Sequence, residues 1–366
     1  MILMNDFKRE ADLLMGPQLA ACERVIRSGW FILGKELESF EREWGQYCQS
    51  SFVIGTGNGM DALEIGLRAL GVGPGDEVIT TPMTAFATVL AILRAGATPV
   101  LADINPLSAI LDPASVERCI NSKTRAVIVV HLYGQAAPLD DFDALCRKHN
   151  LYLVEDCAQA HGALWNGRPV GSVGTFSAWS FYPTKNLGAL GDAGAISTGS
   201  EVLASQARQF RNYGQAERYH HPVPGLNSRL DELQAAILRV RLEHLNPWVK
   251  RRREIAQAYT AGICHPQVDL MALPEMAERH AHHLYVITCA RRDALQVHLR
   301  ALGVETLIHY PIAVHCQLSC RDLQRDPAGL FHAEMHSSKC LSLPCHPQLS
   351  HEDMNFVIES INSFES

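Results

Sequence analysis

The 366-residue sequence contains no apolar run approaching the roughly 20 residues that a membrane-spanning helix needs. Its first fifteen positions are interrupted by charged residues such as Lys8, Arg9 and Glu10, so no export signal is expected. It also lacks an excess of positive charge, because 32 Lys and Arg stand against 39 Asp and Glu. Nucleic acid is therefore an unsuitable main partner. A soluble, globular protein is expected.

The cysteines lack the spacing of a disulfide or zinc framework. There are eleven, an odd number, scattered along the chain, which favours a reducing compartment and predicts a cytoplasmic protein. Cysteines gather near the C-terminus, but their pairs are spaced by three and four residues and form no CxxC knuckle. The sequence predicts small core residues there and no metal site: Cys316, Cys320, Cys340, Cys345 and His346.

Short β-rich runs alternate with helical stretches, which is typical of an α/β protein with a mostly parallel sheet. A chain of this length predicts two domains. We expect a large domain at 1–250, ending after a helix that starts beyond Asp231 and continues toward Asn246-Pro247, and a small C-terminal domain at 251–366. Strands are predicted at residues 51–54, 77–80, 98–102, 126–131, 152–155, 176–179 and 194–197. In the small domain we predict a strand at 283–289 and helices at 292–302 and 351–364.

A glycine-rich segment, Gly55-Thr56-Gly57-Asn58-Gly59, follows an apolar strand and opens a helix. Glycines allow backbone N–H groups to approach an anion at a helix N-terminus. The segment reads GxGxG rather than GxGxxG, and no acid follows at the end of the next strand, which disfavours a nicotinamide dinucleotide. A purely structural turn remains an alternative at this point.

Two carboxylates, Glu155 and Asp156, end another apolar strand and are followed by Gln159. Ligands of open α/β sheets collect at the carboxyl ends of the strands, so a buried Asp156 could face a cationic group. The alternative is an exposed acid that caps the next helix.

Lys185 lies in a stretch of aromatic and small residues, from Phe176 to Ala189, that contains no acid to pair with it. Burial of an unpaired lysine lowers its pKa and makes it a nucleophile that can form a Schiff base. Most lysines are solvated surface groups, but these neighbours would make a poor surface.

Five ordered motifs together resemble the DegT/DnrJ/StrS family of PLP-dependent nucleotide-sugar aminotransferases. They cover nearly the whole chain, ending with His309-Tyr310-Pro311 and Leu341-Ser342-Leu343-Pro344. The motifs are Asn58-Gly59-Met60-Asp61-Ala62-Leu63, Glu155-Asp156-Cys157-Ala158-Gln159, Ser180-Phe181-Tyr182-Pro183-Thr184-Lys185-Asn186-Leu187-Gly188, Arg211-Asn212-Tyr213-Gly214 and Gly225-Leu226-Asn227-Ser228-Arg229-Leu230-Asp231-Glu232-Leu233-Gln234-Ala235-Ala236.

The resemblance implies a fold type I PLP transferase, with a mostly parallel seven-stranded sheet flanked by helices, a smaller C-terminal α+β domain, and a homodimer that shares its active sites. The cofactor would be pyridoxal 5'-phosphate. By the same resemblance, Lys185 would hold the cofactor covalently, Asp156 would pair with its ring nitrogen, and Gln159 would bond its ring hydroxyl. The phosphate would be held by Ser180, by the backbone of Gly59 and Met60, and by Asn227 of the partner; the sugar would lie near Tyr182, His309 and Tyr310.

Two positions depart from the family pattern. Met60 stands where the family commonly has Thr, so a hydroxyl for the phosphate is missing. Ala85 occupies the position that often supplies an aromatic stacked on the PLP ring, and Phe86, one residue on, is the stacking candidate.

The resemblance implies transfer of an amino group from L-glutamate to a keto group of a nucleotide-linked deoxysugar. The segment Glu217-Arg218-Tyr219 looks more like members that act on dTDP-3-keto-6-deoxyhexoses. A 4-keto nucleotide sugar or a keto-cyclitol is the alternative acceptor. A non-catalytic sensor with this fold is a more distant alternative and would be expected to have lost Lys185, and related dehydratases replace that lysine by His.

Overall fold

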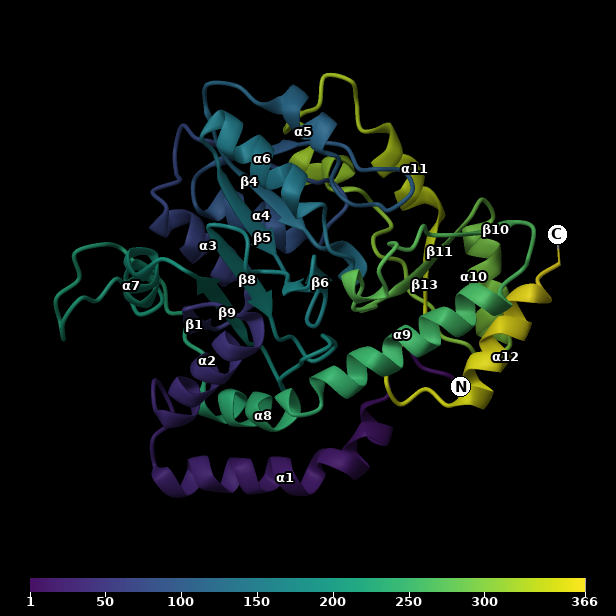
Figure 1. Ribbon diagram of the computed structural model, residues 1–366, viewed down its shortest axis with the longest axis horizontal. Helices are drawn as coiled ribbons and strands as arrows, with labels where there is room; N and C mark the ends of the chain where they lie inside the picture. Colours follow the sequence, from purple (N-terminus) through teal and green to yellow (C-terminus); the bar gives the residue numbers. More distant parts are fainter. Residues whose placement is uncertain (366) are drawn as a thin grey trace.

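The computed structural model describes residues 1–365 and contains one large sheet (Figure 1). The strands lie in the order β1-β9-β8-β5-β4-β2-β3-β12. All seven strands predicted for this sheet are present: β1 (Phe52–Thr56), β2 (Glu77–Thr80), β3 (Thr98–Leu101), β4 (Thr124–Val130), β5 (Tyr152–Asp156), β8 (Phe176–Ser180) and β9 (Gly194–Thr198). The eighth strand, β12 (Gln324–Arg325), comes from the C-terminal part of the chain and was not predicted, because two residues show no period.

The sheet is mostly parallel, as predicted. Only β9 is antiparallel to its neighbours, β1 and β8, and every other pairing is parallel. Thr56 at the end of β1 and Ser180 at the end of β8 both pair with Gly194, the first residue of β9. Asp156 ends β5 at the same edge of the sheet. The topology therefore brings all the motif-bearing strand ends together.

Helices cover both faces of this sheet. Because both faces are covered, central strands such as β4 are almost continuously apolar, with alternate residues facing opposite cores. One face is covered by α3 (Gly59–Ala69), α4 (Phe86–Arg94) and α7 (Glu201–Phe210). The other is covered by α2 (Lys35–Cys48), α5 (Pro113–Cys119), α6 (Leu139–His149) and α8 (Glu232–Leu242).

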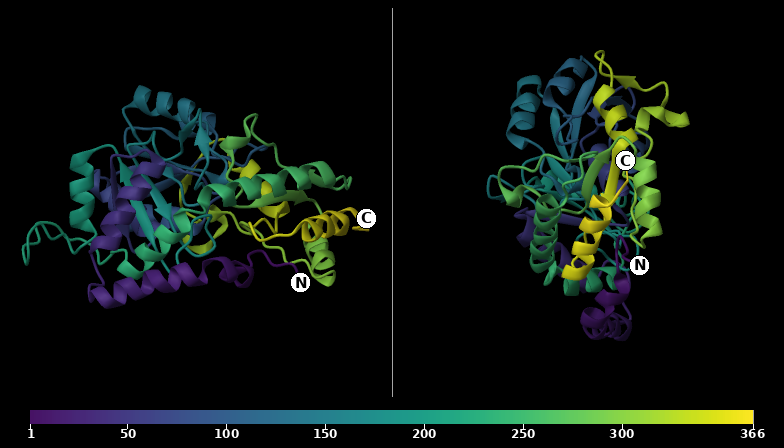
Figure 2. Two further views of the ribbon diagram at one scale, coloured as in Figure 1. Left: turned by 60° about the horizontal axis from the view of Figure 1, so that its bottom comes forward. Right: turned by 90° about the vertical axis from the view of Figure 1, so that its right-hand side faces the viewer.

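Helix α1 (Phe7–Ser28) lies along α8 at the edge of the molecule (Figures 1 and 2). Ala21 and Val25 of α1 pack on Ala236 of α8. The chain before α1 joins the C-terminal unit, where Ile2 forms a parallel bridge with Val304. Within residues 1–365 no helix combines the length and apolar character needed to cross a membrane.

The C-terminal unit has its own hydrophobic core around an antiparallel sheet. The sheet contains β10 (Val268–Leu270), β11 (Tyr285–Cys289) and β13 (Cys340–Leu343), and packs on α9 (Leu245–Gly262), α10 (Arg292–Ala301) and α12 (His351–Asn362). The predicted strand and the two predicted helices of this unit are all found, within two residues at each end. The remaining elements are α11 (Phe331–Lys339), the ribbon β6 (Leu164–Trp165) with β7 (Arg168–Pro169), and the short helices η1 (Leu132–Gly134), η2 (Ala277–Arg279), η3 (Val314–Cys316) and η4 (Leu318–Cys320).

The long helix expected after Asp231 is in fact two helices. α8 ends at Leu242, and α9 begins at Leu245 and runs to Gly262. Pro247 did not end a helix, because it lies in the first turn of α9, where a missing N–H costs nothing. α9 therefore passes through position 250, and a division of the chain into domains there stays a prediction.

Gly194 is expected to be essential for the close packing at the carboxyl edge. A Cβ added there would lie 2.3 Å from the backbone carbon of Asn58, whereas a Cβ at Gly199, at the other end of β9, meets nothing within 4 Å. Because backbone atoms cannot move aside cheaply, Gly194→Ala should lower the free energy of unfolding by about 1–3 kcal/mol. The matched variant Gly199→Ala should change it by less than about 0.5 kcal/mol. Urea unfolding of both variants checks this, and equal effects would contradict it.

Candidate active site

Lys185 lies in the turn that follows β8 and is half-buried. Its backbone N–H donates to the Tyr182 carbonyl at 2.8 Å, and the side chain of the next residue, Asn186, donates to the Ala281 carbonyl at 3.0 Å. Among residues 1–365 its side-chain nitrogen has no hydrogen-bond or ion-pair partner. Burial lowers the pKa of Lys185 from 10.5 to about 8, and the negative charge of Asp156 opposes part of this decrease. A larger share of this amine is therefore neutral near pH 8 than for an ordinary lysine, and its role as a nucleophile stays a prediction.

Asp156 is buried at the end of β5, 6% exposed. Its Oδ2 accepts a hydrogen bond from Thr88 Oγ1 at 2.8 Å, and its Oδ1 accepts one from the Ala158 N–H at 3.1 Å. No cation is bonded to it among the described residues, and burial raises its pKa, against the lowering effects of these bonds and of Lys185. A carboxylate held in this way fits a cationic partner such as a protonated ring nitrogen.

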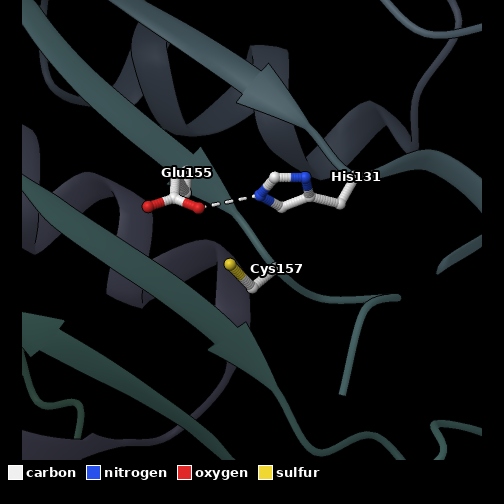
Figure 3. Close-up of side chains that lie close together, drawn as sticks. All are labelled: His131, Glu155 and Cys157. Carbon is white, nitrogen blue, oxygen red and sulfur yellow. Dashed lines mark hydrogen bonds and ion pairs between the residues drawn. The ribbon is translucent and has the colours of Figure 1, made fainter. Parts of the chain in front are cut away.

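The neighbouring Glu155 lies beside His131 and Cys157, in a different environment from that of Asp156 (Figure 3). The Ala137 N–H donates to Nδ1 of His131, so Nε2 carries the proton and donates to Glu155 at 2.9 Å. The same carboxylate also accepts from three backbone N–H groups of the loop before β8: Gly171, Val173 and Gly174. Burial alone would raise the pKa of Glu155, but these bonds lower it. Glu155 therefore fixes the loop before β8 through these hydrogen bonds.

Two groups of side chains bring potential metal ligands within 4.8 Å of one another. One is His131, Glu155 and Cys157 (Figure 3), and the other is His315, Cys316 and Glu334. In the first group both imidazole nitrogens and both carboxylate oxygens are already in hydrogen bonds, and burial raises the pKa of the Cys157 thiol. In the second, His315 Nε2 bonds Glu334 at 2.9 Å. The sequence prediction of no metal stays a prediction.

Gln159 is buried between the large unit and Tyr310 of the C-terminal unit. Its Oε1 accepts from the Tyr133 N–H at 2.6 Å, and its Nε2 donates to Tyr310 Oη at 3.1 Å. Burial, together with the charge of Asp156, raises the pKa of Tyr310 well above its usual range, so the phenol stays protonated. The structure therefore places Gln159, Asp156 and Tyr310 around one corner of the site.

The first turn of α3 lies directly against Ser180. Asn58 caps the helix by accepting from the Asp61 N–H at 2.8 Å, whereas the N–H groups of Gly59 and Met60 have no partner among residues 1–365 and could bind an anion. A Cβ at Gly59 would come within 2.7 Å of the Ser180 Cβ, so only glycine fits there. Met60 packs against the core under α3 and supplies no hydroxyl. This cradle suits a phosphate.

Three of the other four predicted site residues lie toward solvent. Phe86, the first residue of α4, is 38% exposed and lies two residues before Thr88. Tyr182 is 51% exposed. Asn227 is exposed and its side chain has no partner among residues 1–365. The remaining one, His309, is bonded through Nδ1 to Ser342 Oγ at 2.8 Å, and burial with the nearby charge of Lys185 lowers its pKa to about 4.

The sequence analysis missed Thr88 and Tyr133, although both contact predicted site residues. Thr88 left a usable signal, because it is the one polar residue between the first and last positions of the apolar helix α4. Its hydroxyl also bonds that of Thr84 at 2.8 Å, which extends the support of Asp156 to the loop before α4. Tyr133 contacts Gln159 through its backbone N–H, and a backbone contact leaves no signal in a sequence.

A free amine beside a buried strand-end carboxylate, at the carboxyl edge of a mostly parallel sheet, is the arrangement of a PLP-dependent aminotransferase. The chain belongs to the DegT/DnrJ/EryC1/StrS aminotransferase family, whose model matches residues 15–362. The resemblance found in the sequence is thereby confirmed.

Named relatives are similar over nearly their full length. The chain is 47% identical to the erythromycin biosynthesis sensory transduction protein EryC1 of Saccharopolyspora erythraea, covering 94% of each chain. It is 42% identical to the dTDP-3-amino-3,4,6-trideoxy-alpha-D-glucose transaminase of Streptomyces venezuelae, covering 98% of this chain and 95% of that protein. The crystal structure of S. venezuelae DesV in complex with a ketimine intermediate superposes with a TM-score of 0.95 at 42% identity, covering 99% and 97%.

The pKa of Lys185 predicts how fast the apo-protein takes up pyridoxal phosphate at each pH. Only the neutral amine is a nucleophile, so the rate should rise with pH and level off above about 8 rather than above 10. Since Asp156 raises this pKa, Asp156→Asn should move the midpoint to lower pH. Stopped-flow absorbance measures both curves. A rate that still climbs at pH 10 would contradict the assignment.

Proposed function

We propose that this chain binds pyridoxal 5'-phosphate and transfers an amino group from L-glutamate to carbon 3 of a dTDP-linked 3-keto-6-deoxyhexose. One observation supports the assignment of the cofactor. The amine of Lys185, whose pKa is lowered, occurs together with the carboxylate of Asp156, which has no cation bonded to it among the described residues. The name of the 42% identical transaminase supports a 3-amino sugar product.

The residues present fit the cofactor. Asp156 would hold the ring nitrogen protonated, and Gln159 would bond the ring hydroxyl. The first turn of α3, at Gly59 and Met60, would bind the phosphate together with Ser180. Phe86 is the candidate to stack on the ring. When bound, the cofactor supplies an electron sink that allows a carbon–hydrogen bond next to nitrogen to lose its proton.

Lys185 is the group that moves this proton. An amine with a pKa of about 8 changes its protonation state readily near neutral pH, which suits it to act first as base and then as acid. Asp156, which Thr88 fixes by a hydrogen bond, would keep the ring nitrogen of the cofactor positively charged, and this charge draws electrons from the amino donor.

Tyr182 and His309 are proposed to bind the sugar. Tyr182 is exposed beside the lysine turn. His309 stays neutral, because its pKa is about 4. The bond to Ser342 fixes its ring, and its free Nε2 can donate to or accept from a sugar hydroxyl without adding charge.

The experiment that tests the proposal compares acceptors. With L-glutamate as donor, the purified holoenzyme should aminate a dTDP-3-keto-6-deoxyhexose at least tenfold more efficiently, in kcat/KM, than the 4-keto isomer or a keto-cyclitol. Lys185→Ala should reduce turnover by several orders of magnitude, because the anchor and the proton carrier are lost together. Mass spectrometry of the products checks both results. Preference for the 4-keto sugar would refute the position of the ketone, and activity only on simple 2-oxo acids would refute the sugar.

We propose further that the active unit is a homodimer with shared sites. Large apolar side chains are exposed and would be covered by a second copy: Trp30 (63%), Phe31 (49%), Leu190 (58%) and Tyr213 (45%). Asn227, predicted to reach the partner's phosphate, is exposed, and its side chain has no hydrogen-bond partner among residues 1–365 of its own subunit. The loop at residues 215–224, which follows α7, extends away from the body of the subunit (Figures 1 and 2), as expected of an arm that contacts a partner.

Hybrid dimers test whether Asn227 acts across the interface. In a dimer of one Lys185→Ala subunit and one Asn227→Ala subunit, isolated through two different tags, one site should carry both defects and the other none. One cofactor per dimer should then be held as tightly as in the wild type, although the Asn227→Ala homodimer holds it about tenfold more weakly or worse. Equilibrium dialysis counts the tight sites. No tight site in the hybrid would show that Asn227 serves its own subunit, and a fully active monomer would refute the dimer.

We also propose that the protein is cytoplasmic. All eleven cysteines are free, as suits a reducing compartment. A sensory role, suggested by the printed name of the relative EryC1, has less support, because this chain retains the lysine that catalysis needs.

A further inference from the structure

The glycine-rich turn, residues 55–59, begins on an edge strand. β1 is the outermost strand of the large sheet and lies beside β9. In an antiparallel pair, alternate residues turn both their N–H and their C=O groups away from the neighbouring strand. Gly55 is such a residue and is buried, so its peptide groups need partners from outside the sheet.

One ion pair supplies both partners. Glu41 of α2 accepts from the Gly55 N–H at 2.8 Å, and Nη1 of Arg211, the residue after α7, donates to the Gly55 carbonyl at 2.9 Å. The same Nη1 donates to Glu41, and Arg211 is only 8% exposed. Side chains from α2 and from the end of α7 therefore fix the position of Gly55.

Ser228 fixes the next part of the turn. It is buried, and its Oγ accepts from the Gly57 N–H at 3.0 Å. Its own N–H donates to the Arg211 carbonyl at 2.9 Å, so Arg211 and Ser228 hold one another as well as the turn. Both residues lie in motifs that carry the family resemblance, and the proposed function leaves them without a role.

Strands β8 and β9 hold the end of the turn. The Asn58 backbone lies so close to Gly194 of β9, and Gly59 so close to Ser180 of β8, that neither glycine leaves room for a Cβ. The whole turn is therefore confined, from its first glycine to the start of α3.

A site binds its ligand well only when its donors are kept within about 0.5 Å of the productive geometry. We propose that Arg211 and Ser228 are positioning residues that hold the turn so that the N–H groups of Gly59 and Met60 point at the phosphate of the cofactor. This inference rests on the proposed function and deepens it, because it assigns the affinity for the phosphate in part to residues that do not contact it.

The test compares two ligands that differ only in the phosphate, pyridoxal 5'-phosphate and pyridoxal. A change that displaces the turn should weaken binding of the first and not of the second, since pyridoxal does not use the turn. Ser228→Ala should raise the Kd of pyridoxal phosphate about three- to tenfold, as expected for one hydrogen bond, and that of pyridoxal by less than about twofold. Titration of the apo-protein, followed by the visible absorbance band, gives both constants.

Ser197→Ala is the matched control. Ser197 is also buried, and its Oγ accepts from the Trp179 indole N–H at 2.8 Å, within the sheet. Loss of this bond should lower the stability of the fold without changing the ratio of the two dissociation constants. Equal weakening of both ligands by Ser228→Ala, or no weakening of either, would overturn the inference.

Arg211→Lys covers a folding failure of Ser228→Ala. Lysine keeps the positive charge, but its side chain is shorter and lacks the planar fork, so the bonds to Glu41 and to the Gly55 carbonyl are not both kept. Its Kd for pyridoxal phosphate should rise about threefold more than its Kd for pyridoxal, as for a weakened hydrogen bond; equal changes would overturn the inference.

The two proposals fail differently. A wild-type protein that acquires no visible band with pyridoxal phosphate refutes the proposed function. A wild type that binds it normally, with the same ratio of dissociation constants in both variants, refutes only the positioning role of Arg211 and Ser228.

Discussion

The site depends on two charged groups that the protein buries without giving either a full partner. An isolated ion costs several kcal/mol to transfer from water to a protein interior, so an amine and a carboxylate in this state destabilise the fold unless a ligand compensates them. Burial lowers the pKa of Lys185 and raises that of Asp156, and each change reduces the charge that must be buried. A cofactor with a cationic ring nitrogen and an electrophilic carbon satisfies both groups at once. The other residues at the carboxyl edge of the sheet help to position Lys185 and Asp156.

The two neighbouring acidic residues at the end of β5 have different hydrogen-bond environments. Successive side chains of a strand point to opposite faces, so Glu155 and Asp156 enter different environments. Glu155 is saturated by His131 and three backbone N–H groups and has no capacity for a ligand. Asp156 has two bonds from the protein and retains accepting capacity. The resemblance singled out Asp156, and the donors around each carboxylate give the physical reason for the difference.

The sequence was sufficient for most of the fold, because the strands of the large sheet are buried on both faces and so appear as short apolar runs between helical patterns. It was insufficient where structure depends on contacts between distant segments. β12 pairs with β3 across more than two hundred residues, and Ile2 pairs with Val304. The break between α8 and α9 was missed because proline is as compatible with the first turn of a helix as with its end.

The same limit applies to the site. Lys185, Asp156 and the glycine-rich turn were visible as motifs, because their chemistry is unusual for their surroundings. The bonds that orient them were not, since Thr88 and the Tyr133 N–H belong to segments with no motif of their own.

The C-terminal unit reaches the candidate site through the segment that carries His309 and Tyr310. Bonds from Tyr133 to the His309 carbonyl and from Asn186 to the Ala281 carbonyl join the two units on either side of the site. Because Gln159 bridges the Tyr133 backbone and the Tyr310 hydroxyl, a shift of the C-terminal unit would disturb the position of the Gln159 side chain. A ligand bound against His309 would therefore act on the same segment that positions Tyr310. His309 and Tyr310 are consecutive in the chain, so a displacement of His309 would also move Tyr310 and its bond to Gln159.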